Sequence, residues 1–115
     1  MKILAVDDER LICELLFEFL SLKGYEVTAS TSGQEALVKF EESRPDVVIL
    51  DIRMPGMSGM DLLRKIKDID STVRVIMLSA YGDSGTIQEA LNSGADYYME
   101  KPLEFDHLMK ILNDI

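Results

Sequence analysis

Short apolar runs alternate with amphipathic segments along this chain, and the alternation limits the folds open to it. The strand-like runs cover residues 3–6, 26–30, 47–50, 73–78 and 96–100. After the first run, apolar residues recur at helical spacing, at Ile12, Leu15, Leu16, Phe19 and Leu20. This order predicts an α/β domain: a single doubly wound, five-stranded parallel sheet with five helices on its two faces.

Turn and cap residues mark where the predicted helices begin and end. Gly24 supplies a stop for the first helix, and Ser32 with Glu35 matches a capping box that starts the second. The second helix must end before Pro45, and Ser58 is suited to cap the third. A fourth helix is expected over about residues 84–93, and the last one starts near residue 105.

Four of the apolar runs stop at residues with charged or reactive side chains. The residues that follow them are Asp7 and Asp8, Asp51, Ser79, and Lys101 with Pro102. Each could be ordinary turn or capping chemistry, or a solvated surface lysine. In a parallel sheet, however, the carboxyl ends of the strands meet at one edge, where ligands bind in open α/β folds. We therefore expect these groups to share one crevice.

Charge repulsion predicts what such a crevice would bind. Carboxylates about 4 Å apart repel by about 4 kcal/mol per pair at an effective dielectric constant near 20. Lys101 can offset only one of the three charges. A divalent cation would offset the rest, and oxygen ligands favour a hard ion such as Mg²⁺ or Mn²⁺. With metal and lysine present, the crevice could accept a phosphoryl group.

Four motifs, in this order and spacing, give the chain a specific family resemblance. They are Val6-Asp7-Asp8-Glu9, Leu50-Asp51-Ile52-Arg53-Met54-Pro55-Gly56, Leu78-Ser79-Ala80 and Lys101-Pro102. From Lys2 to Ile115 the sequence resembles the receiver domain of bacterial two-component response regulators. The resemblance implies a flavodoxin-like sheet of strand order 2-1-3-4-5. It also implies one receiver domain over residues 1–115.

The resemblance assigns roles to the acidic residues. Asp51 matches the phosphoacceptor, whose carboxylate attacks a phosphohistidine to give an aspartyl phosphate. Asp8, Asp51 and the backbone carbonyl of Arg53 would bind Mg²⁺ directly, and Asp7 would act mainly through bound water. The protein would then be a signalling switch that catalyses its own phosphorylation and dephosphorylation, not an enzyme acting on external substrates.

The same resemblance assigns phosphate binding and switching. The Ser79 hydroxyl, the Ala80 amide and the Lys101 ammonium would hold phosphoryl oxygens. Ser79 and Tyr98 match the residues that move on phosphorylation, and the readout surface would be the fourth helix, fifth strand and fifth helix. A partly buried strand aromatic is the other interpretation of Tyr98.

Further expectations concern phosphoryl lifetime and the Lys101–Pro102 peptide. Arg53 and Tyr81 occupy positions that tune phosphoryl lifetime in the family, in a direction that the sequence does not reveal. The peptide before Pro102 is cis in the family, whereas base rates alone favour trans.

Composition and the resemblance together define the expected partners. The net charge of −9, from 12 basic and 21 acidic residues, disfavours direct nucleic-acid binding by this domain. No stretch approaches the length of a membrane span, and the single cysteine, Cys13, suits a reducing cytoplasm. The resemblance implies a sensor histidine kinase or phosphotransfer protein as donor. A downstream effector domain or partner, and homodimerisation on phosphorylation, are compatible with it.

Other classes of function fit the sequence less well. An aspartate-nucleophile phosphatase needs a second carboxylate two residues after the nucleophile, where this chain has Arg53. A flavin or nucleotide binder on the same fold would need a Gly-rich loop after a strand, and the first loop is acidic instead. A receiver-like module that is never phosphorylated would usually lack the acidic pair or the acceptor, and here all of them are present.

Overall fold

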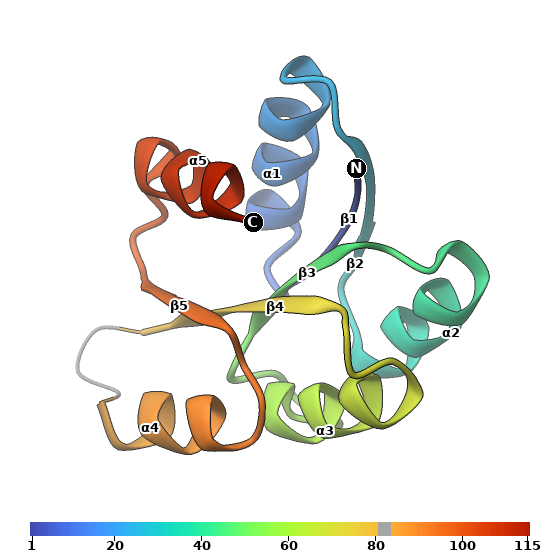
Figure 1. Ribbon diagram of the computed structural model, residues 1–115, viewed down its shortest axis with the longest axis vertical. Helices are drawn as coiled ribbons and strands as arrows, with labels where there is room; N and C mark the ends of the chain where they lie inside the picture. Colours follow the sequence, from blue (N-terminus) through green and yellow to red (C-terminus); the bar gives the residue numbers. More distant parts are fainter. Residues whose placement is uncertain (81–83) are drawn as a thin grey trace.

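The computed structural model describes residues 1–80 and 84–115, and these form a parallel five-stranded sheet with helices on both faces (Figure 1). The strand order is β2-β1-β3-β4-β5, as predicted. The strands are β1 (Lys2–Val6), β2 (Glu26–Ser30), β3 (Val47–Asp51), β4 (Arg74–Ser79) and β5 (Tyr97–Glu100). The helices are α1 (Arg10–Leu22), α2 (Gly33–Ser43), α3 (Gly59–Ile69), α4 (Ser84–Asn92) and α5 (Phe105–Asp114).

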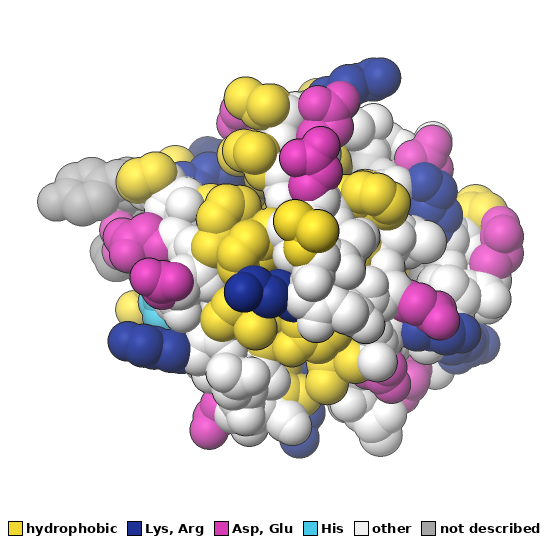
Figure 2. Space-filling model, turned by 90° about the horizontal axis from the view of Figure 1, so that it is seen from above, with side chains coloured by type: hydrophobic (Ala, Val, Ile, Leu, Met, Phe, Trp, Pro, Cys, Tyr) yellow, Lys and Arg dark blue, Asp and Glu magenta, His cyan; other side chains and the backbone are white. Residues whose placement is uncertain are grey.

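Two helical layers cover the sheet, and each encloses its own core. In Figure 1, α1 and α5 lie on one face and α2, α3 and α4 lie on the other. Val47 and Ile49 point into the first core, whereas Val48 and Leu50 point into the second. Because both faces of β3 are covered, all of its residues are buried, which explains its unbroken apolar run. Figure 2, seen from the α1–α5 side, shows hydrophobic side chains gathered across the middle of that face.

The strand register brings the polar strand ends to one edge of the sheet. Val6 is paired with Leu50, Asp51 with Leu78, and Ser79 with Glu100. Backbone hydrogen bonds continue past the strands: the Ile52 amide donates to the Leu78 carbonyl at 2.9 Å. The loops that follow β1, β3, β4 and β5 therefore leave the sheet side by side.

The predicted serine caps form, but only half of the capping box does, because the Ser32 amide donates to the Ser30 hydroxyl at 3.3 Å and not to Glu35. The hydroxyls of Ser32 and Ser58 each accept a hydrogen bond from the amide three residues on, both at 3.2 Å. Before Pro45, α2 ends with Arg44 in a left-handed conformation (φ 47°). β3 and β4 each extend one residue beyond the predicted range, to Asp51 and Ser79, because the ladder of backbone bonds does not require apolar side chains. In the described part of the chain, no helix has the length and apolarity to cross a membrane.

Candidate functional site

Three carboxylates meet at the carboxyl edge of the sheet, as the sequence predicted. Asp7 and Asp8 follow β1, and Asp51 is the last residue of β3. One oxygen from each of the three lies within 4.8 Å of the other two. At that separation each pair of charges repels by about 3 kcal/mol at an effective dielectric constant near 20. The cluster is therefore an electrostatically costly arrangement.

Asp7 is fully buried within this cluster. Its Oδ1 accepts a hydrogen bond from the Glu9 amide at 2.9 Å. Its Oδ2 lies 3.1 Å from Lys101 Nζ, an ion-pair distance. No other described residue donates to that oxygen. Burial raises the pKa of Asp7, and the Glu9 amide and the Lys101 ammonium oppose this only in part.

Asp51 is almost as deeply buried, with 7% of its side chain exposed. Its Oδ1 accepts a long hydrogen bond from the Arg53 amide at 3.4 Å and lies 3.7 Å from Lys101 Nζ. Burial first, and then the negative charge of Asp7, raise the pKa of Asp51 to about 7. Without a bound cation, this carboxyl therefore ionises less readily than an exposed aspartate.

Lys101 is the positive charge at the centre of the site. Its Nζ contacts Asp7, Asp51 and, at 3.6 Å, Glu9. Burial lowers the pKa of Lys101, but the contacts with Asp7 and Asp51 outweigh it, so the pKa is raised overall. The Lys101 amide donates to the Ser79 carbonyl at 2.7 Å, which ties this loop to β4. The Lys101–Pro102 peptide is cis, as the resemblance implied.

The candidate switch residues lie beside the cluster. The Ser79 side chain is buried, and its hydroxyl donates to the Met99 carbonyl at 3.5 Å. Ala80 follows it at the exposed edge. Tyr98 is 43% exposed and is paired with Met77, whose side chain belongs to the α2–α3–α4 core. Tyr81 lies outside the described residues.

The register of β5 separates the two adjacent tyrosines. The Tyr97 ring packs against the α1–α5 core, and its hydroxyl donates to Asp114 at 3.2 Å. Because side chains alternate along a strand, Tyr98 lies on the opposite face, towards α3 and α4.

Three residues contribute to the site without having been assigned a role from the sequence. Glu9 pairs with Lys101, and its amide orients Asp7. Gly59 lies so close to the backbone of Asp51 and Ile52 that a Cβ at position 59 would overlap the carbonyl oxygens of both residues. The Cys13 thiol donates to the Asp7 carbonyl at 3.3 Å. Only Glu9 carried a sequence signal, since it adjoins the aspartate pair.

The residues present fit a small divalent cation. The donor set is three carboxylates within reach of one another, and one buried oxygen, Asp7 Oδ2, lacks a hydrogen-bond donor among the described residues. Oxygen-only donors of this kind suit Mg²⁺ or Mn²⁺ rather than softer metals. The doubly wound sheet and this acidic, lysine-bearing edge together define a class of small α/β domains with a candidate cation site at the carboxyl ends of the strands.

Comparison with known proteins identifies the family within that class. The profile of the response regulator receiver domain matches residues 3–113. Sporulation initiation phosphotransferase F of Bacillus subtilis (strain 168) is 40% identical over 107 residues, covering 93% of this chain and 86% of that protein. The structure of Vibrio cholerae chemotaxis protein CheY4 superposes with a TM-score of 0.93 at 32% identity, covering 99% of this chain and 97% of the other. The chain belongs to the response regulator receiver domain family.

Some relatives in this family are much longer proteins. NtrX from Brucella abortus superposes with a TM-score of 0.94 at 33% identity, and the match covers 98% of this chain but only 26% of that one. Receiver domains thus occur both as nearly the whole of a protein and as one part of a larger one. Receiver domains as a class work with histidine kinases or phosphotransfer proteins.

Proposed function

We propose that Asp51 is the phosphoacceptor through which this receiver domain takes a phosphoryl group from a histidine kinase or phosphotransfer protein. The observation that carries the proposal is the buried Asp51 carboxylate, which faces two further aspartates and lies 3.7 Å from Lys101 Nζ. A purely structural role gives no reason to gather these charges. The raised pKa of Asp51 supports the proposal, because perturbed pKa values are frequent among functional groups.

The chain's own residues supply the nucleophile and its surroundings. An ionised Asp51 oxygen attacks phosphorus as the bond from phosphorus to the histidine nitrogen breaks, leaving an aspartyl phosphate. Lys101, Ser79 and the Ala80 amide are proposed to hold the phosphoryl oxygens. These fixed groups favour the transferred phosphoryl by position and charge.

Asp7, Asp8, Asp51 and the backbone carbonyl of Arg53 are the proposed ligands of Mg²⁺ or Mn²⁺. Bound there, the cation would neutralise charge on the carboxylates and on the phosphoryl oxygens. We further propose that the domain uses this site for its own phosphorylation and dephosphorylation, with Arg53 and Tyr81 tuning the lifetime of the phosphoryl group.

A switch between two surface states is the proposed output. Ser79 moves towards the phosphoryl group, Tyr98 turns inward from its exposed position, and the surface of α4, β5 and α5 changes. An effector domain, a partner protein or a second phosphorylated copy would then read that surface. Residues 1–115 would act as one receiver domain, and the cytoplasmic setting remains a prediction from the sequence.

Intact mass spectrometry tests the phosphoacceptor directly. The domain is incubated with Mg²⁺ and acetyl phosphate, and we expect one added phosphoryl group per chain. Asp51→Asn should abolish the adduct, and chelation of the metal should suppress it. Asp68→Asn, an exposed carboxylate on α3, is the matched control and should be modified like the parent. An adduct that persists in Asp51→Asn would refute the assignment.

A further inference from the structure

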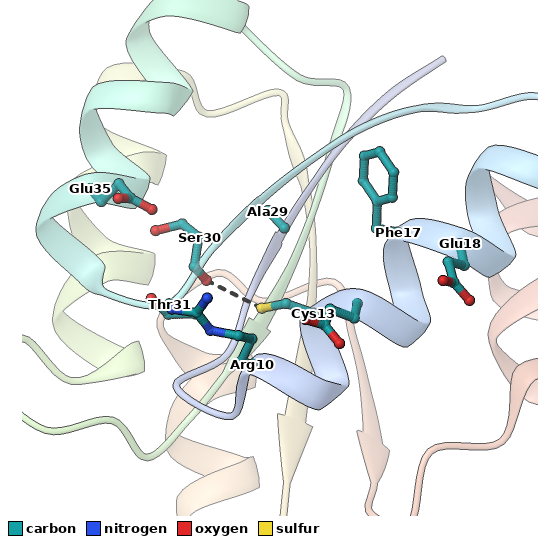
Figure 3. A pocket seen from close by; sticks show the side chains of 9 residues that line it. Arg10, Cys13, Phe17, Glu18, Ala29, Ser30, Thr31 and Glu35 are labelled. Carbon is teal, nitrogen blue, oxygen red and sulfur yellow. Dashed lines mark hydrogen bonds between the residues drawn. The ribbon is translucent and has the colours of Figure 1, made fainter.

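A second hollow lies away from the acidic cluster, between α1 and the segment that joins β2 to α2. It is open to solvent and has a volume of about 400 Å³. Figure 3 shows Arg10, Cys13 and Phe17 from α1 on one side and Ser30, Thr31 and Glu35 on the other. A cavity of this size lies within the range of ligand-binding clefts, roughly 300–1,000 Å³. None of the roles proposed above uses it.

The hollow continues along α1 as an apolar strip. A neighbouring hollow of about 430 Å³ is lined by Phe17, Glu18, Ser21 and Leu22, so Phe17 belongs to both. Phe17 is 47% exposed and Leu22 is 87% exposed. Both side chains line the second hollow, and an occupant that covered them would remove their apolar surface from water. Both hollows are open to solvent and share Phe17 and Glu18, and we call them together the α1–β2 groove.

The rim of this groove is acidic. Glu14 and Glu18 project from α1, and Glu35 stands on the opposite side. Glu35 already pairs with Lys39 at 3.4 Å. Within the described residues, neither Glu14 nor Glu18 forms an ion pair, and Arg10 is the one cation lining the groove. An occupant that brings positive charge beside an apolar group would complement both features.

The floor of the groove touches the backbone of the acidic site. The single Cys13 thiol hydrogen is shared between the Asp7 carbonyl, 3.3 Å from the sulfur, and the Ser30 carbonyl, 3.5 Å from it. The Asp7 amide in turn donates to that same Ser30 carbonyl at 3.2 Å. An occupant pressing on Cys13 would therefore lie one hydrogen bond from the main chain of Asp7.

We propose that this α1–β2 groove docks a short amphipathic segment of a partner protein, in which a large apolar side chain is flanked by Lys or Arg. The apolar side chain would cover Phe17, and the cations would pair with Glu14 and Glu18. A second copy of this chain fits poorly, because a two-fold interface would set this acidic rim against the acidic rim of the other copy. Nucleic acid and anionic membranes are repelled by the same charges and by the net charge of −9.

The test uses a defined probe and the whole 115-residue chain. The probe is a capped peptide of about 14 residues, with Leu and Lys arranged as an amphipathic helix, and its control has Glu in place of Lys. Binding to the ¹⁵N-labelled domain is followed by amide shifts, and affinity is measured at low and high salt. Two variants remove the features of the groove: Phe17→Ser, and Glu14→Gln with Glu18→Gln. The matched control is Glu41→Gln with Glu42→Gln, which removes two exposed charges from α2.

We expect shifts confined to residues 10–22 and 29–35 and to Asp7. Phe17→Ser should weaken binding about tenfold, and the Glu14/Glu18 variant about fivefold with loss of salt dependence. The Glu41/Glu42 control should bind within about twofold of the parent. Equal binding by all variants, shifts spread over other faces, or equal binding of the Glu peptide would overturn the proposal. A dimer in sedimentation that Phe17→Ser dissolves would also overturn it, in favour of a second copy.

Discussion

Asp51→Asn should stabilise the metal-free domain at alkaline pH, although it removes the proposed phosphoacceptor. The pKa of Asp51 is raised to about 7 from an ordinary value of 3.8. The folded state therefore holds the proton more tightly than the unfolded state, so stability is lost as pH rises from about 4 to about 7. Each pKa unit is worth about 1.4 kcal/mol, which sets a ceiling near 4 kcal/mol for the cost of ionising Asp51. Asparagine carries no charge and avoids this cost.

Urea unfolding of parent and variant, in the presence of a chelator, measures the effect. At about pH 8 we expect Asp51→Asn to be more stable by about 2–4 kcal/mol, with the difference shrinking towards about pH 4.5. Asp68→Asn should retain the pH slope of the parent, since its carboxylate is exposed. Mg²⁺ should stabilise the parent more than Asp51→Asn, because binding to the folded state alone raises stability by mass action. Parallel pH curves, or a variant less stable than the parent at alkaline pH, would refute the reasoning.

Three further substitutions test how the fold supports the site. Gly59→Ala should lower the free energy of unfolding by about 1–3 kcal/mol, because the new methyl group overlaps the Asp51 carbonyl. The same overlap should slow phosphorylation by acetyl phosphate, and an unchanged phosphorylation rate would contradict this. Ser32→Ala should cost about 1 kcal/mol in thermal or urea unfolding through loss of the α2 cap, with phosphorylation unchanged. Lys101→Ala should lower the free energy of unfolding by about 3 kcal/mol, because Asp7 is left buried without its cation. This variant should still be phosphorylated, but the amide chemical-shift changes caused by phosphorylation should be smaller than in the parent. Shift changes as large as those of the parent would argue against a sensing role for Lys101.

The polar residues at the ends of the apolar runs were the features from which most of the site could be predicted. The order of elements follows from periodicity, and the parallel sheet then requires Asp51, Ser79 and Lys101 to share an edge. Cap residues located helix ends well because Ser32 and Ser58 act on amides only three residues away. Interactions between residues this close in the chain can be predicted from the sequence.

The contacts that escaped prediction join residues far apart in the chain or depend on side-chain rotation. The Ser79 hydroxyl turns to the Met99 carbonyl, a choice that local sequence does not determine. The need for glycine at position 59 arises from the path of the β3–α3 loop past Asp51. The groove beside Cys13 and Phe17 likewise depends on how α1 packs on β2, since helical spacing alone marked neither residue as part of a cavity.

The end of β4 supports both halves of the acidic site at once. The Ile52 amide, next to Asp51, bonds to the Leu78 carbonyl, and the Lys101 amide bonds to the carbonyl of the following residue, Ser79. Local opening at the end of β4 would therefore release the loop of the acceptor and the loop of the ammonium in a single event. In hydrogen exchange the amides of Ile52 and Lys101 would open together as one cooperative unit, so that the acceptor loop and the lysine loop would be lost in the same event.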